Sequence, residues 1–287
     1  YDMPQSKYVL KSVITNDGFT GDNTFGPDVS KITVQYVDPY YSRRERAFYG
    51  FAQVITNQID TKQGGAASDI VYRKTAQRFH NKNYYLKGLL YNEFLMNAAW
   101  SNWKINSTTY ALRRLKDTNT DWIYLEGEDE KNYGSNGYAC FVAVIRNTTN
   151  YPEGDTGSKW TSTFFTKYDQ WGNATDVEDS GDPDIGASEI LTSKIVYNSI
   201  NPAAYIIMPT SVKNTANAVT REKKAEYSAN GNLSKMTVLN QGTNYSVYDF
   251  EYDVYGNITK STGPANVQNQ RFFQQYTYDD NVKTYPV

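Results

Sequence analysis

The sequence has 287 residues and a formal net charge of −2 at pH 7, with lysine and arginine nearly balanced by aspartate and glutamate. This balance excludes the strongly basic surface typical of proteins that bind nucleic acid or anionic membranes. A single cysteine excludes an internal disulfide, and no apolar run approaches the roughly 20 residues of a membrane-spanning helix. With 26 tyrosines, many β-branched residues and no helical apolar spacing, the chain is predicted to be all-β.

The first 116 residues are predicted to form six strands. The connections between them include Asn16-Asp17-Gly18, Asp38-Pro39-Tyr40-Tyr41 and a glycine-rich loop over 62–68, all built from residue types that favour turns. The predicted strands are Lys7 to Thr15, Lys31 to Val37, Ala47 to Thr56, Val71 to Phe79, Leu86 to Leu95 and Trp103 to Leu115.

The next segment, residues 117–158, is interpreted as a longer hairpin. Its two strands are predicted over Asp121 to Glu128 and Gly137 to Arg146, with an acidic tip at residues 126–130. A second acidic turn follows at residues 179–184. Carboxylate oxygens are the ligands that Ca²⁺ prefers, but neither turn has the ligand spacing of a calcium loop. Both are therefore interpreted as solvated turns, and no metal is predicted.

The last segment, residues 159–287, contains strands predicted at Ile190 to Tyr197 and Ile206 to Lys213, with a helical turn at residues 201–204. It also contains a repeat: tyrosine, three residues, Gly-Asn, an aliphatic or small residue, and serine or threonine. The copies begin at Tyr168, Tyr227 and Tyr252, and a further Tyr-Asp occurs at residues 278–279. The repeat residues are Tyr168, Gly172, Asn173, Tyr227, Gly231, Asn232, Tyr252, Asp253, Gly256 and Asn257.

Each copy is predicted to be a strand, a tight turn and a returning strand. In the third copy, Asp253 can accept backbone hydrogen bonds as the turn opens, and Gly256 can take a positive φ without a Cβ clash. This pattern is typical of a short hairpin with a glycine bulge. Because a lone hairpin is marginal in water, the copies are predicted to stack into a continuous curved sheet.

No residue pattern in the sequence singles out a catalytic site. His80 is the only histidine, so a catalytic triad would depend on it alone. A structural role for His80 at the end of a strand is favoured over a catalytic one. Two alternatives stay open. Tryptophans such as Trp160 and Trp171 could stack on sugars in a surface carbohydrate-binding module, and abundant carboxylates could support a glycosidase.

Several segments, taken together, resemble the YD-repeat and Rhs proteins, which include the B component of bacterial insecticidal toxin complexes and, more distantly, the teneurins. Residues 252–259 are similar to the YD repeat, and the Arg-Glu-Arg run followed by Gly-Phe is similar to a toxin-complex B motif. The segment Arg78-Phe79-His80 with Tyr84 to Gly88, the segment 201–209 and the closing 276–280 extend the resemblance in the same order. The residues that carry the family motifs are Arg44, Glu45, Arg46, Gly50, Phe51, His80, Lys87 and Gly88.

The resemblance implies a non-enzymatic wall segment of a large spiralling β-shell, which in relatives encloses a C-terminal toxin or effector. It implies that the rest of the parent shell chain, its effector and a further toxin component are partners, with no cofactor, nucleic acid or membrane insertion. Secretion or display on a bacterial cell surface is also implied, with any targeting signal outside this sequence. On this interpretation residues 1–287 form one shell fragment with unpaired sheet edges: a toxin-complex-B-like segment over 1–116, the insertion over 117–158 and YD-repeat units over 159–287.

Overall fold

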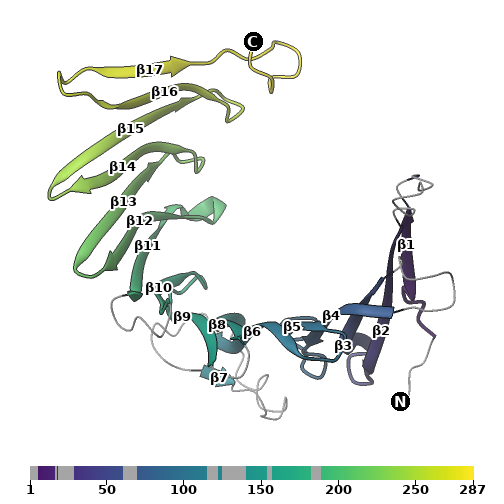
Figure 1. Ribbon diagram of the computed structural model, residues 1–287. Helices are drawn as coiled ribbons and strands as arrows, with labels where there is room; N and C mark the ends of the chain where they lie inside the picture. Colours follow the sequence, from purple (N-terminus) through teal and green to yellow (C-terminus); the bar gives the residue numbers. More distant parts are fainter. Residues whose placement is uncertain are drawn as a thin grey trace, which may run out of the picture. The chain divides into compact units, whose positions relative to one another are not determined.

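The computed structural model describes residues 6–16, 18, 29–60, 70–114, 122–124, 140–153, 157–181 and 189–287. These residues form seventeen β-strands and one short 3-10 turn, η3 (Pro202–Ala204), so the all-β prediction is confirmed (Figure 1). None of the described residues belongs to a helix long and apolar enough to cross a membrane. The loop predicted over 62–68, the acidic tip over 126–130 and residues 182–184 of the second acidic turn lie outside the described residues.

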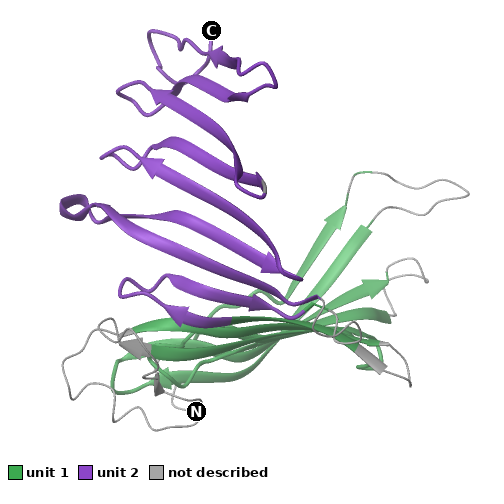
Figure 2. Ribbon diagram, turned by 90° about the vertical axis from the view of Figure 1, so that its left-hand side faces the viewer, with its two compact units in different colours: residues 1–164, 181–184 green, residues 165–180, 185–287 purple. Residues whose placement is uncertain are grey.

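The chain divides into two compact units (Figure 2). Unit 1 comprises residues 1–164 and 181–184, and unit 2 comprises residues 165–180 and 185–287. The strands of unit 1 are β1 (Ser12–Asn16), β2 (Val29–Ser42), β3 (Ala47–Asp60), β4 (Ile70–Phe79), β5 (Leu90–Asn97), β6 (Asn102–Arg114), β7 (Trp122–Tyr124), β8 (Cys140–Glu153) and most of β9 (Gly157–Tyr168). Those of unit 2 are β10 (Ala174–Asp179), β11 (Leu191–Asn201), β12 (Ile206–Ala216), β13 (Val219–Tyr227), β14 (Leu233–Gln241), β15 (Asn244–Tyr252), β16 (Ile258–Ala265) and β17 (Arg271–Gln275).

Within each unit the strands pair antiparallel with their neighbours in sequence. In unit 1 the pairing runs from β1 through β6, where β6 also pairs with β8 past the short β7. In unit 2 it runs without interruption from β10 to β17. The prediction of stacked antiparallel hairpins is therefore confirmed.

Buried residues are found in unit 1. Leu86 and Leu112, 1% and 0% exposed, form one cluster against Leu89, Tyr110 and Val142. A second cluster joins Ile55, Ala76 and Met96 on neighbouring strands β3, β4 and β5, with Phe94 packed against it. The Tyr110 hydroxyl donates to the Leu90 carbonyl at 2.9 Å, and burial raises the pKa of Tyr110. These clusters give unit 1 a small apolar core.

None of the described residues of unit 2 is buried. Its strands present alternating faces, as expected for antiparallel hairpins. One face carries oppositely charged side chains on adjacent strands, because Glu226 pairs with Lys235 and Glu251 with Lys260. The other face carries aliphatic and aromatic side chains, such as Met236 paired with Tyr248.

Three sequence predictions are wrong in detail. The strand predicted from Lys7 to Thr15 begins only at Ser12. The segment Asp38-Pro39-Tyr40-Tyr41, predicted to connect two strands, lies inside β2, and the hairpin turn is at residues 43–46. Asp38 takes a φ of +50° and allows β2 to continue through Pro39, which still pairs with Phe51. The Ser42 hydroxyl closes the real turn by accepting from the Glu45 N–H at 3.3 Å.

The strand predicted from Leu86 to Leu95 begins only at Leu90. The side-chain oxygen of Asn83 accepts from the N–H groups of Tyr85 and Leu86 and holds the preceding residues in a turn. Leu86 therefore enters the core from a turn, which a run of apolar residues cannot distinguish from a strand. The helical turn predicted at residues 201–204 is confirmed, since η3 follows Asn201, whose side chain accepts from the Ala204 N–H at 3.3 Å.

Candidate functional site

The repeat turns are the first candidate site. In the third copy, Oδ1 of Asp253 accepts from the N–H groups of Tyr255 and Asn257 at 2.9 Å each, and Oδ2 accepts from the Asn257 side-chain amide at 2.9 Å. The Gly256 N–H donates to the Asp253 carbonyl at 3.2 Å with Gly256 at a φ of +89°. The predicted turn chemistry is present. The asparagine of the Gly-Asn pair completes the turn by donating its N–H and its side-chain amide to the Asp253 carboxylate.

The first copy repeats this geometry, and the second copy repeats part of it. Asp169 accepts from Trp171, from the Asn173 N–H and from the Asn173 amide, with Gly172 at a φ of +88°. In the second copy a serine replaces the aspartate, and its hydroxyl accepts only from the Asn232 N–H at 3.3 Å, with Gly231 at +86°. The glycine conformation is therefore common to all three, whereas the side-chain bonds vary.

A fourth turn of the same kind joins β16 to β17, and the sequence analysis missed it. The side-chain oxygen of Asn266 accepts from the N–H groups of Gln268 and Gln270 at 3.0 and 2.9 Å. Asn269 occupies the position of the repeat glycine, with a φ of +59°. Asparagine tolerates this conformation better than most residues, so the spacing of Asn266 and Asn269 was the available signal.

Successive turns at one edge of unit 2 contact each other. The Asn201 amide, beside η3, donates to the Ala229 carbonyl in the second repeat turn at 3.2 Å. A Cβ on Gly256 would lie 4.0 Å from the Asn232 amide nitrogen, and the Asn257 amide donates to the Lys283 carbonyl at 2.6 Å. We call this series, formed by residues 201–205, 228–232, 253–257 and 279–285, the turn column. Asparagine side chains join its first two turns and its last two turns, in addition to the pairing of the strands.

The tyrosines of the repeat reach backward over the sheet. The Tyr227 hydroxyl donates to the Pro209 carbonyl at 2.9 Å, and the Tyr278 hydroxyl donates to the Ile258 carbonyl at 2.9 Å. Partial burial raises the pKa of Tyr227 and of Tyr252. At Tyr197 burial, assisted by the negative charge of Asp169, has the same effect on the pKa. The tyrosine thus uses its apolar ring and its polar tip in the same position.

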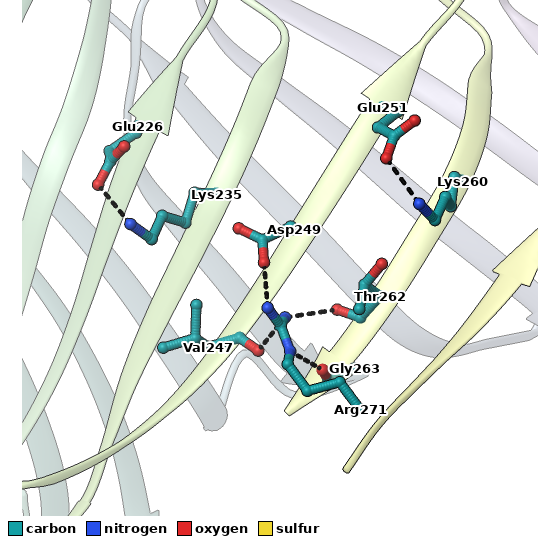
Figure 3. A network of polar contacts seen from close by, with 9 residues as sticks. All are labelled: Glu226, Lys235, Val247, Asp249, Glu251, Lys260, Thr262, Gly263 and Arg271. Atoms are coloured by element: carbon teal, nitrogen blue, oxygen red, sulfur yellow. Dashed lines mark hydrogen bonds and ion pairs between the residues drawn. The ribbon is translucent and has the colours of Figure 1, made fainter. Parts of the chain in front are cut away.

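The charged face of unit 2 ends in an arginine network on β15, β16 and β17 (Figure 3). Arg271 donates to the Asp249 carboxylate at 2.5 Å, to the Val247 carbonyl at 2.9 Å and to the Gly263 carbonyl at 2.8 Å. The register of β15 and β16 pairs Asp249 with Thr262, and extending it by two residues brings Val247 opposite Pro264, which has no N–H to donate to the Val247 carbonyl. The guanidinium therefore supplies the hydrogen bond that proline removes.

Unit 1 contains a second candidate site, where residues of the family motifs meet. The Asn81 amide donates to the carbonyls of Asp38 and Gly50 at 2.7 and 3.3 Å, and the Gly88 N–H donates to the His80 carbonyl at 2.8 Å. The Lys87 ammonium lies over the rings of Tyr49 and Tyr84, 4.5 and 4.1 Å from their centroids. We call this group the motif corner. The sequence analysis missed Asn81, whose position one residue after His80 was the only signal.

The remaining motif residues lie nearby in sequence but have other contacts. Arg44, Glu45 and Arg46 lie in the exposed β2–β3 turn, where Arg44 and Glu45 form an ion pair at 3.6 Å. Phe51 packs against Tyr36 and Phe48, with ring centroids 4.7 and 5.4 Å apart. These contacts support the β2–β3 hairpin.

Some of the side chains considered for catalysis and sugar binding are found in packing contacts. The His80 ring lies 4.6 Å from the Tyr91 ring and 6.0 Å from the Tyr110 ring. Among the tryptophans, the Lys74 ammonium lies 4.0 Å from the centroid of the Trp100 ring, and the Arg146 guanidinium lies 5.7 Å from the centroid of the Trp160 ring. Trp103 and Trp171 are exposed, on β6 of unit 1 and in the first repeat turn of unit 2. Across the described ranges no group of three or more histidine, cysteine or acidic residues could hold a metal ion.

Comparison with known proteins adds an independent observation. The family model for the middle/N-terminal region of the insecticide toxin TcdB matches residues 1–82. The predicted resemblance to toxin-complex B components is confirmed. No protein of curated function matches the sequence.

The fold is also shared with solved toxin-complex structures. The crystal structure of TcdB2–TccC3 matches with a TM-score of 0.56 at 10% identity, over 90% of this chain and 21% of that chain. A Tc holotoxin pore from Photorhabdus luminescens matches with a TM-score of 0.55 at 8% identity, over 87% of this chain and 20% of that chain. The sequence therefore spans about a fifth of the length of these toxin-complex proteins.

Proposed function

We propose that this chain is a non-catalytic wall segment of a large YD-repeat shell of the toxin-complex type, which encloses a C-terminal effector. The observation that carries the proposal is the match along 90% of this chain to only 21% of the chain in TcdB2–TccC3. A segment that continues a larger sheet needs to join its hairpins to one another, and the turn column does so.

The candidate sites support a structural role. The turn column, the arginine network and the motif corner all direct their polar groups onto backbone carbonyls or neighbouring rings of this chain. Such contacts fix strand positions and leave few polar groups to act on a substrate. The partners of this role are the rest of the shell chain, the enclosed effector and a further toxin component, in a secreted or surface-displayed bacterial protein.

The proposal is tested by placing an affinity tag on the native gene product and purifying it from its source cells. We expect a polypeptide several times longer than 287 residues, a hollow particle in electron micrographs, and an internal segment that proteases digest only after the particle is opened. A free-standing product of 287 residues that remains folded would contradict the proposal.

A further inference from the structure

The β5–β6 turn of unit 1 has the hydrogen bonds of a repeat turn but carries a tryptophan at the glycine position. The Asn97 N–H donates to the Ser101 carbonyl at 3.0 Å, and the Trp100 N–H donates to the Asn97 carbonyl at 3.2 Å. The Ser101 N–H donates to Oδ1 of Asn97 at 2.9 Å, as the equivalent N–H does in the third repeat turn. Trp100 therefore stands where Gly256 stands in that turn, and its φ is +68°.

This backbone conformation disfavours a large side chain. It weakens a turn by roughly 5- to 30-fold when the residue has a Cβ. The Lys74 ammonium lies 4.0 Å from the centroid of the Trp100 ring, and such a cation–π contact at an exposed site returns only about 2- to 5-fold. Trp100 is still 50% exposed. Its indole is thus better explained by what it presents to solvent than by the folding of the hairpin.

A second exposed indole lies close to the first. Trp103, on β6, is 47% exposed and follows Trp100 by three residues, so their Cα atoms are at most about 11 Å apart. The pairing of β5 with β6 shifts between Leu95 and Met96, which leaves Trp103 as the extra residue of a β-bulge. Both indoles are therefore presented by irregular backbone, one by a strained turn and the other by a bulge.

The surroundings of the two indoles are cationic. Residues 72–76 and 94–106, which form the turn and the adjoining strand ends, contain no acidic residue and three cationic ones, Arg73, Lys74 and Lys104. Glu93, the next acidic residue along β5, accepts hydrogen bonds from two side-chain amides on β4 and β6. A ligand that covers the indoles therefore meets positive charge.

We propose that Trp100 and Trp103 form a binding site for an acidic saccharide. The C–H groups of a pyranose ring carry partial positive charge and pack on the negative face of an indole. A carboxylate or sulfate on the same sugar accepts charge-assisted hydrogen bonds from the Lys74 ammonium. This binding site goes beyond the wall function and does not depend on it.

A peptide ligand fits this place less well. Peptides commonly add a strand to an open sheet edge or lie in a groove. Here β5 pairs with β4 and β6, and β6 pairs with β5 and β8, so neither strand beside the turn is an edge. A saccharide needs no strand edge, because stacking on the two indoles and an ion pair provide its recognition.

Titration calorimetry of the native product with matched oligosaccharides tests the proposal. A tetramer of galacturonic acid, the methyl ester of that tetramer and a sulfated glucose tetramer separate the recognition of carboxylate, neutral sugar and sulfate. We expect at least one acidic tetramer to bind at least tenfold more tightly than the methyl ester. The acidic tetramer that binds more tightly identifies the anionic group.

Variants assign the binding to this turn. Trp100→Gly should weaken binding at least tenfold, while the amides of residues 90–106 exchange no faster, because glycine relieves the turn. Trp171→Ala, which removes an exposed indole from the first repeat turn of unit 2, is the matched control and should bind within twofold of the parent. Lys74→Gln should reduce the preference for the acidic tetramer over its ester at least fivefold.

Absence of binding, equal affinity for the acid and its ester, or an equal loss in Trp171→Ala would overturn the proposal. Faster amide exchange in the β5–β6 hairpin of Trp100→Gly would also overturn it, since the indole would then be retained for folding. None of these results bears on the wall function, whose test is the length and shape of the native product.

Discussion

Unit 1 and unit 2 both consist of antiparallel hairpins paired in sequence order, but they stabilise those hairpins by different means. Unit 1 buries aliphatic side chains such as Leu86, Leu112 and Ala76 almost completely. In unit 2 no described residue reaches that degree of burial, and the hairpins are joined by repeat turns, tyrosine hydroxyls and charged side chains. The comparison indicates that in unit 2 the geometry of the repeat turns provides part of the stabilisation that an apolar core provides in unit 1.

This difference is open to direct measurement. If the comparison is correct, truncating an apolar side chain should lower the free energy of unfolding more in unit 1 than in unit 2. Disturbing a repeat turn or the arginine network should destabilise unit 2. Hydrogen exchange read by mass spectrometry reports each unit separately, which is necessary because two units need not unfold in a single transition.

The largest effect is expected for Leu112→Ala in unit 1. The side chain is fully buried against Leu86, so its removal leaves a cavity and should lower the free energy of unfolding of unit 1 by about 2–5 kcal/mol. The matched control is Leu233→Ala in unit 2, where the leucine is only half-buried and the loss should stay below about 1.5 kcal/mol. Equal losses in the two units would contradict the comparison.

A smaller effect is expected for Gly256→Ala in the third repeat turn. The added Cβ has room, since its nearest neighbour would be 4.0 Å away, but a φ of +89° strains any residue with a Cβ, by about 1–2 kcal/mol. Gly263→Ala is the control, because its Cβ would meet only the Phe272 carbonyl at 3.6 Å and no positive φ is involved. Faster exchange of the amides of residues 244–265 in Gly256→Ala alone is the expected result.

Arg271→Lys should destabilise the last hairpin by about 1 kcal/mol. Lysine keeps the charge but cannot bond Asp249, Val247 and Gly263 at once, because it lacks the planar fork of the guanidinium. Exchange of the amides in β16 and β17 measures the effect, and Lys224→Arg, on the same face beside Glu222, is the control. Unchanged exchange in Arg271→Lys would show that the network contributes nothing to holding β17.

The smallest effect is expected on acidification. Partial desolvation tends to raise the pKa of Asp253, but hydrogen bonds from the Asn257 side chain and from the N–H groups of Asn257, Tyr255 and Gly256 outweigh it and lower the pKa. The stabilisation is therefore complete above the ordinary carboxyl value of about 4 and is lost as pH falls through the lowered value.

Amide exchange in residues 244–265, compared at matched intrinsic rates between pH 6 and pH 3, should show the third hairpin weakening toward the acid end. Asp253→Asn carries no titrating carboxyl at this position and should remove most of the pH dependence. If the exchange of Asp253→Asn depends on pH as strongly as that of the parent chain, the titrating group is a different one. Asp279 is such a group, because its pKa is lowered chiefly by the hydrogen bond from the Val282 N–H.

The turns were the most predictable part of the fold, because their chemistry is local. Gly172, Gly231 and Gly256 identify hairpins from sequence alone, and each has the expected positive φ. The same rule failed at the fourth turn, where Asn269 replaces glycine, and at Asp38-Pro39, where a turn-forming pair lies within a strand. Local composition cannot decide such cases, since the pairing with Phe51 across the hairpin determines the outcome.

The contacts between hairpins could not be predicted. Whether Arg271 reaches Val247 depends on the register of three strands and on the missing N–H of Pro264. The burial of Leu112 against Leu86 depends on a turn that was interpreted as a strand. Both contacts join residues more than 20 positions apart, beyond the range over which periodicity carries information.

The turn column gives the two edges of unit 2 unequal tolerance to change. The Asn201 and Asn257 amides fix the distance between one turn and the next, so an added residue in these turns would break the contact on both sides. At the opposite edge, the turns at Asn217–Ala218 and Gly242 are exposed hairpin tips. A peptide grafted at Gly242 should therefore leave the sheet intact, and unit 2 would serve as a display scaffold with one constant edge and one variable edge.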